Sequence, residues 1–227
     1  MPPIARASVP DLVFAELCEA ILSGRYAPGE RLPTQRTLAA DLDVNMASIR
    51  EALGRLEQLR LVEIRHGDAM RVLDWRRSGG LEALAVLGSV DRSTIAALFE
   101  ARRLLLTEAA RLAATRRSDE QAAGLRRLAA AIAGAADDDG ALVADWAYMA
   151  AVVEAAGNLV FQLIMNSVRE LYLPNARAFA PVVADRAALG RLYERGATAI
   201  GARDPDGAAD ALRRLAAAQE ERMVAAR

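Results

Sequence analysis

The sequence predicts a mainly α protein, in which an N-terminal winged helix-turn-helix domain precedes an all-α antiparallel bundle of six or seven helices. Residues 10–73 fall into short, varied segments separated by Gly, Pro and Asp turn signals. After the polar stretch 76–80, the chain is rich in Ala, Leu and Arg with helical spacing almost to its end. We therefore expect a first domain at 1–75, a linker at 76–80 and a second domain at 81–227.

Composition is typical of a folded globular protein, since 53% of the residues are hydrophobic and 26% are charged. The single cysteine, Cys18, cannot form an internal disulfide. No apolar run approaches the roughly 20 residues of a membrane-spanning helix, and residues 1–10 lack the apolar core of a signal peptide. We expect a cytoplasmic protein with no membrane partner.

Helical periodicity and turn signals predict three helices in the first domain. Apolar residues recur at three- and four-residue steps in the first helix, before Gly24, at Leu12, Val13, Leu17, Ala20 and Ile21. A second short helix opens at Pro33-Thr34 and runs through Leu42. After a tight turn, Asn45 caps a third helix at 46–58. Two helices joined by a tight turn form a helix-turn-helix.

A β-hairpin is expected next, because residues 61–65 and 70–73 alternate apolar and polar side chains around a turn at 66–69. Three helices followed by a hairpin make a winged helix, whose third helix can enter the major groove of DNA while the hairpin turn reaches the minor groove. On this pattern alone, a small α+β domain with no DNA role remains the alternative.

The charge balance does not decide between these alternatives. Residues 1–77 contain 11 Arg and 11 Asp plus Glu, so the domain lacks the net positive charge expected of a nucleic-acid binder. A DNA-binding function must therefore rest on where individual arginines lie.

Turn signals divide the second domain at 137–140, 157–158 and 204–207. Between them, helical spacing predicts helices at Leu81–Gly88, Ser93–Arg116, Asp119–Ala135, Gly140–Ala156, Leu159–Phe179, Val183–Gly201 and Ala208–Ala226. A compact antiparallel bundle is the natural packing for such helices.

Several strings resemble a known family of regulators. The N-terminal domain is similar to that of GntR-type regulators at Arg31-Leu32-Pro33-Thr34-Gln35-Arg36, Leu38-Ala39, Val44, Ser48 to Leu53, Leu56, Leu61-Val62 and His66-Gly67. The helical half resembles the ligand-binding (FCD) domain of the FadR subfamily at Glu100-Ala101-Arg102, Asp145 to Tyr148, Gly157-Asn158 and 199–208. The order of residues 64–67, Trp75, 78–79 and 166–172 is most similar to FadR-like fatty-acid regulators.

The resemblance implies a DNA-contacting surface made of Arg36, Asn45, Met46, Ala47, Ser48, Arg50, His66 and Gly67. The planar guanidinium groups of Arg36 and Arg50 suit phosphate oxygens or the guanine edge. Asn45 and Ser48 can hydrogen-bond the DNA backbone. His66 on a wing tip suits a minor groove. The alternatives are solvated helix charges and an ordinary polar turn residue. Met46 stands where FadR-like proteins often carry Arg, so thymine-methyl contacts could replace hydrogen bonds there.

Many members of the subfamily bind a metal through one Asp and three His. Here Asp145 stands at the first place, but Met149, Tyr193 and, by a looser match, Leu215 stand at the others. These side chains are not the nitrogen ligands that such a metal prefers. We expect no metal cofactor in this domain.

The resemblance also implies a small-molecule effector. Arg102 is the candidate partner of an anionic ligand group, and the alternatives are an internal partner for Asp145 or a surface charge. Tyr148, Tyr172 and Tyr193 could line the same cavity or simply belong to the core. A long-chain acyl-CoA or related acyl compound is the expected effector, and a small organic acid is the alternative.

The expected partners are thus double-stranded DNA, a small-molecule effector and a second copy of the chain, in a homodimer on a palindromic operator. An enzyme is the main competing class, but the chain has no Gly-rich phosphate loop and no Cys/His pair. A purely structural helical interaction protein would leave the helix-turn-helix and the wing without a role.

Overall fold

The computed structural model describes residues 8–64, 70–83, 92–173 and 176–226. The chain divides into two compact units, Met1–Val90 and Asp91–Arg227. The expected mainly α architecture is confirmed, and each unit is built around its own hydrophobic core. In the described part of the chain, no helix combines the length and the apolar character needed to cross a membrane.

Helix α1 (Val9–Leu22) begins with a capping box. The Ser8 hydroxyl accepts from the Asp11 amide, while the Asp11 carboxylate accepts from the Ser8 amide at 3.1 Å. Arg55 of helix α3 (Met46–Gln58) donates to Asp11 at 2.8 Å, which ties the start of α1 to α3. A hydrogen bond from the Ser8 hydroxyl to the Asp11 carboxylate at 2.6 Å, together with the bonds from Arg55 and the Ser8 amide, holds the pKa of Asp11 well below its usual value, at about 2. The capping box therefore also orients the helix on which α3 packs.

The helix-turn-helix consists of α2 (Gln35–Asp41) and α3. Thr34 caps α2, and Asn45 caps α3 as expected. Asp43 in the turn has a φ of 51°, a left-handed conformation that Asp tolerates better than most residues. The buried face of the motif and the core around it are formed by Val13, Leu17, Ile21, Leu38, Ile49, Leu53, Leu56, Val62 and Val72.

The expected hairpin is present but its ladder is short. Strands β1 (Val62–Glu63) and β2 (Arg71–Val72) pair antiparallel, with Val62 opposite Val72. The segment before α2 lies along the other side of β2, because the Leu32 amide donates to the Met70 carbonyl at 2.9 Å. After the hairpin, α4 (Trp75–Ser78) makes a single helical turn, so the expected linker 76–80 begins inside a helix.

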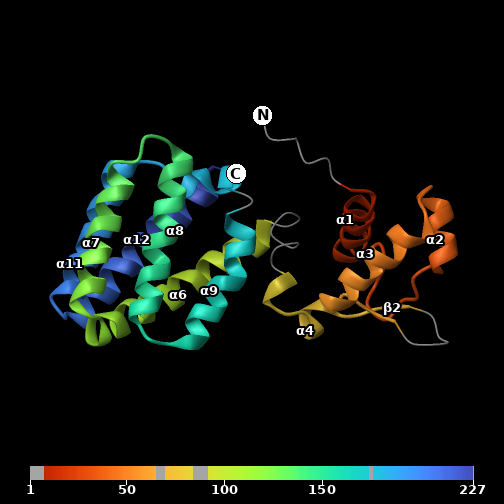
Figure 1. Cartoon of the computed structure of the whole chain (residues 1–227), viewed down its shortest axis with the longest axis horizontal. Helices are drawn as coiled ribbons and strands as arrows, with labels where there is room; N and C mark the ends of the chain where they lie inside the picture. Colours follow the sequence, from red (N-terminus) through yellow and green to blue (C-terminus); the bar gives the residue numbers. More distant parts are fainter. Residues whose placement is uncertain (1–7, 65–69, 84–91, 174–175, 227) are drawn as a thin grey trace. The chain divides into compact units, whose positions relative to one another are not determined.

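The second unit is a bundle whose helices run along one another (Figure 1). Its elements are α6 (Arg92–Arg116), α7 (Asp119–Ala133), α8 (Asp138–Ala155), α9 (Leu159–Tyr172), α10 (Ala176–Phe179), η2 (Ala180–Val183), α11 (Arg186–Gly201) and α12 (Pro205–Ala225). Helix α12 packs on α6 and α11, α7 packs on α8 and α11, and α9 packs chiefly on α8. The core therefore lies among α6, α7, α8, α11 and α12.

Several expected helices differ in their bounds from those observed, and α12, for example, begins at Pro205 and not at Ala208. The expected helix 159–179 ends at Tyr172, and a separate turn, α10, follows. The expected helix 183–201 begins only at Arg186, because Asp185 caps it from a left-handed conformation with a φ of 57°. The expected helix 81–88 is described only at η1 (Leu81–Ala83), a 3₁₀ turn, and its remainder lies outside the described residues.

Arginines beyond the ends of α6 and α11 bind each other's helix. Arg117, which follows α6, is buried and donates to the backbone carbonyls of Ile200 and Gly201. Arg203, which follows α11, donates to the carbonyls of Thr115 at 3.0 Å and Arg117 at 3.3 Å. Carbonyls at a helix C-terminus have no partner within their own helix. Each helix end thus receives its missing donors from the other.

Candidate DNA-binding surface and buried polar core

The start of α3 presents an exposed surface beside α2. Met46, Ala47 and Arg50 of α3 are exposed, as is Arg36 of α2, while the opposite face of α3 is in the core. Neither Arg36 nor Arg50 forms an ion pair or a hydrogen bond with another described residue. Both guanidinium groups are therefore available for phosphate oxygens or base edges.

Asn45 and Ser48 differ from the two arginines in their surroundings. The Asn45 side-chain oxygen accepts from the Ser48 amide at 2.9 Å and from the Ser48 hydroxyl at 3.2 Å. Ser48 is buried, whereas Asn45 is exposed. The structure thus gives both side chains a capping role at the start of α3. The expected wing residues His66 and Gly67 lie outside the described residues.

A polar cluster lies inside the core of the helical unit, around Asp145 of α8. Its carboxylate accepts from the hydroxyls of Tyr172 at 2.7 Å and Tyr193 at 2.5 Å, and from the Gln219 amide at 3.0 Å. Asp145, Tyr193 and Gln219 are each almost completely buried. Because a buried carboxylate needs several donors, these contacts compensate its loss of water. We use the name polar core for Asp145, Tyr172, Tyr193 and Gln219 together with Arg102.

Arg102 of α6 completes the polar core. Its guanidinium donates to the Gln219 side-chain oxygen at 2.6 Å and lies 3.6 Å from the Asp145 carboxylate. This geometry matches the alternative in which Arg102 is an internal partner of Asp145. The Arg102 Nη2 atom is buried and has no hydrogen-bond partner among the described residues. This nitrogen is the one that lies 3.6 Å from Asp145, so it meets the carboxylate at ion-pair distance without a hydrogen bond.

Tyr148 and the ring of Tyr172 also contribute to the packing of the core. Tyr148 is fully buried, donates to the Tyr193 backbone carbonyl at 3.0 Å and meets the Tyr193 ring edge-on. Tyr172 packs between Trp146 and Phe179, with ring centroids 5.5 and 5.0 Å away. The structure brings the expected ligand residues Arg102, Asp145, Tyr172 and Tyr193 together in one cluster. A ligand role for them stays a prediction.

Alkaline titration should reveal the buried tyrosines. Burial and the nearby Asp145 charge raise the pKa values of Tyr172 and Tyr193 well above their usual range, and burial raises the pKa of Tyr148. Because the folded values exceed the unfolded value of about 10, stability is present below that pH and is lost as the pH rises above it. Absorbance at 295 nm and helical circular dichroism, followed on one sample, should show these tyrosines ionising only with unfolding. Ionisation of three tyrosines before any loss of helix would contradict the buried geometry.

The donor set around Asp145 does not fit a metal ion. Met149, Tyr193 and Leu215 occupy the remaining expected positions, and Met149 and Leu215 are buried in the core. Both Asp145 oxygens already accept hydrogen bonds from protein donors. In the described ranges, no group of three or more His, Cys, Asp and Glu side chains could hold an ion. Arg102 supplies the positive charge in this cluster instead.

Gln219 is the member of the polar core that the sequence analysis missed. It lies on the buried face of α12 with Ala208, Leu212, Leu215 and Met223. A single amide at helical spacing within an otherwise apolar face is the signal that could have identified it.

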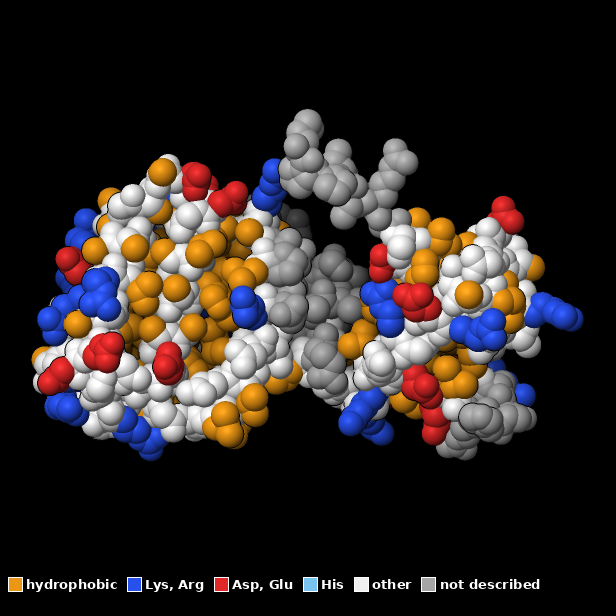
Figure 2. Space-filling view, viewed as in Figure 1, with side chains coloured by type: hydrophobic (Ala, Val, Ile, Leu, Met, Phe, Trp, Pro, Cys, Tyr) orange, Lys and Arg blue, Asp and Glu red, His pale blue; other side chains and the backbone are white. Residues whose placement is uncertain are grey.

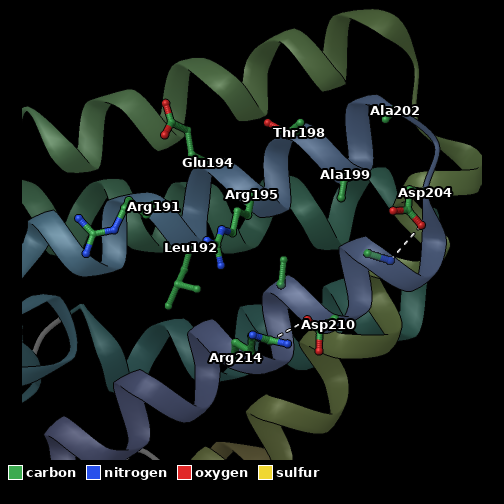
Figure 3. A pocket seen from close by; sticks show the side chains of 12 residues that line it. Arg191, Leu192, Glu194, Arg195, Thr198, Ala199, Ala202, Asp204, Asp210 and Arg214 are labelled. Carbon is green, nitrogen blue, oxygen red and sulfur yellow. Dashed lines mark hydrogen bonds and ion pairs between the residues drawn. The ribbon is translucent and has the colours of Figure 1, made fainter.

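The pockets found among the described residues of the helical unit lie away from the polar core. A groove of about 720 Å³ is lined by residues of α11, α12 and the turn between them (Figure 3). Two of its three carboxylates are already engaged, since Asp204 accepts from the Gly207 amide at 3.0 Å and Asp210 pairs with Arg214 at 2.7 Å. None of the polar-core residues lines it. The chemistry expected from the sequence therefore lies in the interior, away from this groove.

Two family models match the chain, one in each unit. Residues 11–72 match the model described as "Bacterial regulatory proteins, gntR family". Residues 97–218 match the FCD domain model.

Curated relatives agree with these matches. The regulator Mce2R of Mycobacterium tuberculosis is 34% identical over 95% of this chain and 91% of the relative. A "Fatty acid metabolism regulator protein" of Edwardsiella ictaluri is 30% identical over 70% of this chain and 68% of the relative.

Solved structures share the fold. The chain of a Streptococcus agalactiae GntR protein is 25% identical with a TM-score of 0.50, over 93% of this chain and 99% of that chain. Lar, described as controlling the Listeria monocytogenes agr system, has a TM-score of 0.62 at 14% identity, over 99% of this chain and 100% of that one.

Proposed function

Since this chain belongs to the gntR family of bacterial regulatory proteins and is a transcription regulator with an FCD ligand-binding domain, we propose that it acts as a homodimer on a palindromic operator and senses an acyl ligand. In this proposal, the first unit reads DNA in the cytoplasm. A fatty acyl-CoA or related acyl compound bound to the second unit then changes its affinity for the operator.

The DNA-contacting surface is supported by the exposed start of α3, where Arg50 and the nearby Arg36 of α2 form no ion pair with another described residue. The N-terminal residues of a recognition helix contact base edges, and neighbouring cations contact phosphates. Met46 and Ala47 offer methyl groups for thymine rather than hydrogen-bond donors. We therefore propose that the arginines supply most of the affinity and that these apolar side chains favour A·T pairs.

Alanine substitution of Arg50 should weaken binding to the DNA upstream of the protein's own gene by about 5- to 150-fold, and Arg36→Ala should do the same. Fluorescence anisotropy at several salt concentrations measures both effects. Loss of a phosphate contact should lower the salt dependence of binding by about one ion, whereas loss of a base contact should lower the preference over a scrambled duplex. Arg25→Ala is the matched control, because Arg25 is exposed and pairs with Glu16 on α1. If the three variants bind equally well, the proposed surface is wrong.

The acyl effector is supported by the relatives named fatty acid metabolism regulators and by Arg102. Among the described residues its Nη2 atom has no hydrogen-bond acceptor, although Asp145 lies 3.6 Å away, and a guanidinium suits the carboxylate, thioester or phosphate oxygens of such a ligand. We also propose that the domain functions without a metal, since its donor set offers no suitable ligands beyond Asp145.

Adding oleoyl-CoA to the preformed complex tests the effector proposal in the same assay. A change of operator affinity with oleoyl-CoA but not with short organic acids supports an acyl sensor. The reverse pattern favours an organic-acid sensor. Elemental analysis of the purified protein tests the proposal that the domain functions without a metal. One tightly bound metal per chain would refute it.

A further inference from the structure

The groove lined by α11 and α12 contains a group of arginines. Arg191 and Arg195 come from α11, and Arg214 comes from α12. Figure 2 shows basic side chains gathered at the left edge of the helical unit, where α7 and α11 lie in Figure 1. Arg191 and Arg195 are exposed and lie one turn apart, and neither forms an ion pair or a hydrogen bond with another described residue. Like charges one turn apart repel each other, so an anion bound between them would stabilise this surface.

The carboxylates of the two helices leave an excess of positive charge in the groove. Asp204 caps α12, where it accepts from the Gly207 amide. Asp210 pairs with Arg214 at 2.7 Å and also accepts from Arg213, so one carboxylate serves two guanidinium groups. Neither acid therefore neutralises the arginines of α11.

The directions of the side chains on α11 separate the third carboxylate from the groove floor. In Figure 3, Leu192 and Arg195 point toward α12, whereas Glu194 and Thr198 point to the other side of α11. Glu194 forms no ion pair with another described residue. The side of α11 that faces α12 therefore presents a cation beside an apolar side chain.

The groove has the size and the lining of a small-molecule site. Its volume of about 720 Å³ is more than a single phosphate needs and lies within the range of about 300–1,000 Å³ that is typical of ligand pockets. Leu192, Ala199, Ala202 and Ala211 form an apolar wall along it. Guanidinium groups bind phosphate oxygens through two parallel hydrogen bonds. A diphosphate with a flat apolar group attached matches both parts of this lining.

We propose that the groove between α11 and α12 binds the diphosphate group of a nucleotide. Arg195 and Arg214 bind phosphate oxygens from the two helices, Arg191 adds a further positive charge, and the alanines contact the nucleoside. None of the polar-core residues lines the groove, so this site is separate from the proposed effector site and does not depend on it. Such a diphosphate occurs both in a free nucleoside diphosphate and in the nucleotide end of a coenzyme A thioester.

Isothermal titration calorimetry of the full-length chain with ADP, at constant ionic strength and without magnesium, tests the proposal. Arg195→Ala should weaken ADP binding about 10-fold or more, because it removes charge-assisted hydrogen bonds to the phosphates. Arg127→Ala is the matched control, since Arg127 is an exposed arginine of α7 that does not line the groove, and it should leave ADP binding unchanged. Circular dichroism checks that both variants retain their helices.

A variant with the opposite expected effect guards against a general loss of structure. Asp210→Asn removes the carboxylate that competes with phosphate for Arg214. This variant should bind ADP about 3-fold more tightly than the wild-type chain, as expected for the release of an exposed ion pair. Weaker binding by Asp210→Asn would count against Arg214 as a phosphate ligand.

Three results would overturn the site. They are a wild-type chain that does not bind ADP at millimolar concentration, equal binding of AMP and ADP, and an Arg195→Ala variant that binds ADP as the wild-type chain does. Titration of oleoyl-CoA into the same variants identifies the source of the diphosphate. If Arg195→Ala weakens the binding of both compounds, the groove takes the nucleotide end of the thioester, and if it weakens ADP binding alone, the ligand is a free nucleotide. An operator affinity that does not respond to oleoyl-CoA while ADP still binds would refute the acyl effector alone.

Discussion

Replacing Asp145 with alanine is expected to lower the free energy of unfolding by about 3–5 kcal/mol. The substitution leaves Arg102 without its carboxylate and removes the acceptor of the Tyr172, Tyr193 and Gln219 donors. Buried donors that lose their partner retain the full cost of desolvation. Urea unfolding followed by circular dichroism measures the loss. The unfolding slope should stay constant if the native state remains compact.

The double variant Arg102→Met/Asp145→Ala distinguishes the origin of this loss. Removing the guanidinium as well eliminates the uncompensated charge, so the double variant should be more stable than Asp145→Ala alone. The side chain of Arg102 is 17% exposed, so water screens part of its charge and the recovery should be incomplete. A double variant less stable than Asp145→Ala would show that Arg102 contributes mainly through packing.

A methyl group at Gly196 is expected to destabilise the protein by about 1–3 kcal/mol, although alanine normally favours a helix. Gly196 lies on α11, where a Cβ atom would approach Leu212 Cδ2 to 2.6 Å and the Tyr148 hydroxyl oxygen to 2.7 Å. Neither atom can move freely, because Leu212 and Tyr148 are fully buried. Tyr148 must also keep its bond to the Tyr193 carbonyl. Thermal or urea unfolding of Gly196→Ala measures the effect.

Gly124→Ala on α7 is the control with the opposite sign. A Cβ atom there would lie 3.8 Å from the end of the flexible Arg127 side chain, which is ordinary contact. The helix propensity of alanine should therefore stabilise this variant by up to about 1 kcal/mol. If both glycines gave the same change, the close packing of α11 against α8 and α12 would not limit position 196.

Helices with clear caps were the most predictable part of the fold. Residues 46–58 were expected to form one helix because Asn45 is a strong cap, and α3 has these bounds. The helix expected at 159–179 was too long, since its apolar spacing continues beyond Tyr172 while Pro174 cannot donate a helical hydrogen bond. Periodicity reports burial, so it does not reveal where a buried segment changes direction.

The sequence predicted which residues belong to the candidate sites, but it did not predict which of their side chains contact one another. Arg102 and Asp145 were both expected as site residues. Only the fold shows that Gln219 of α12, 74 residues after Asp145, hydrogen-bonds to both of them. Ser48 was expected to contact DNA because of the resemblance of this segment to GntR-type regulators. Its burial follows from the cap that it shares with Asn45, a geometry that the side-chain type alone does not reveal.

Arg117 and Arg203 make the C-terminal ends of α6 and α11 a single cooperative unit, because each arginine donates to backbone carbonyls at the end of the other helix. Fraying of one end would withdraw donors from the carbonyls of the other, so neither end can open alone without leaving buried groups unpaired. Local opening of the bundle is therefore concentrated away from this end. Helix α9, which packs chiefly on one neighbour and supplies the Tyr172 hydroxyl to Asp145, can separate with the loss of fewer contacts. A ligand entering the interior would find its easiest route beside α9.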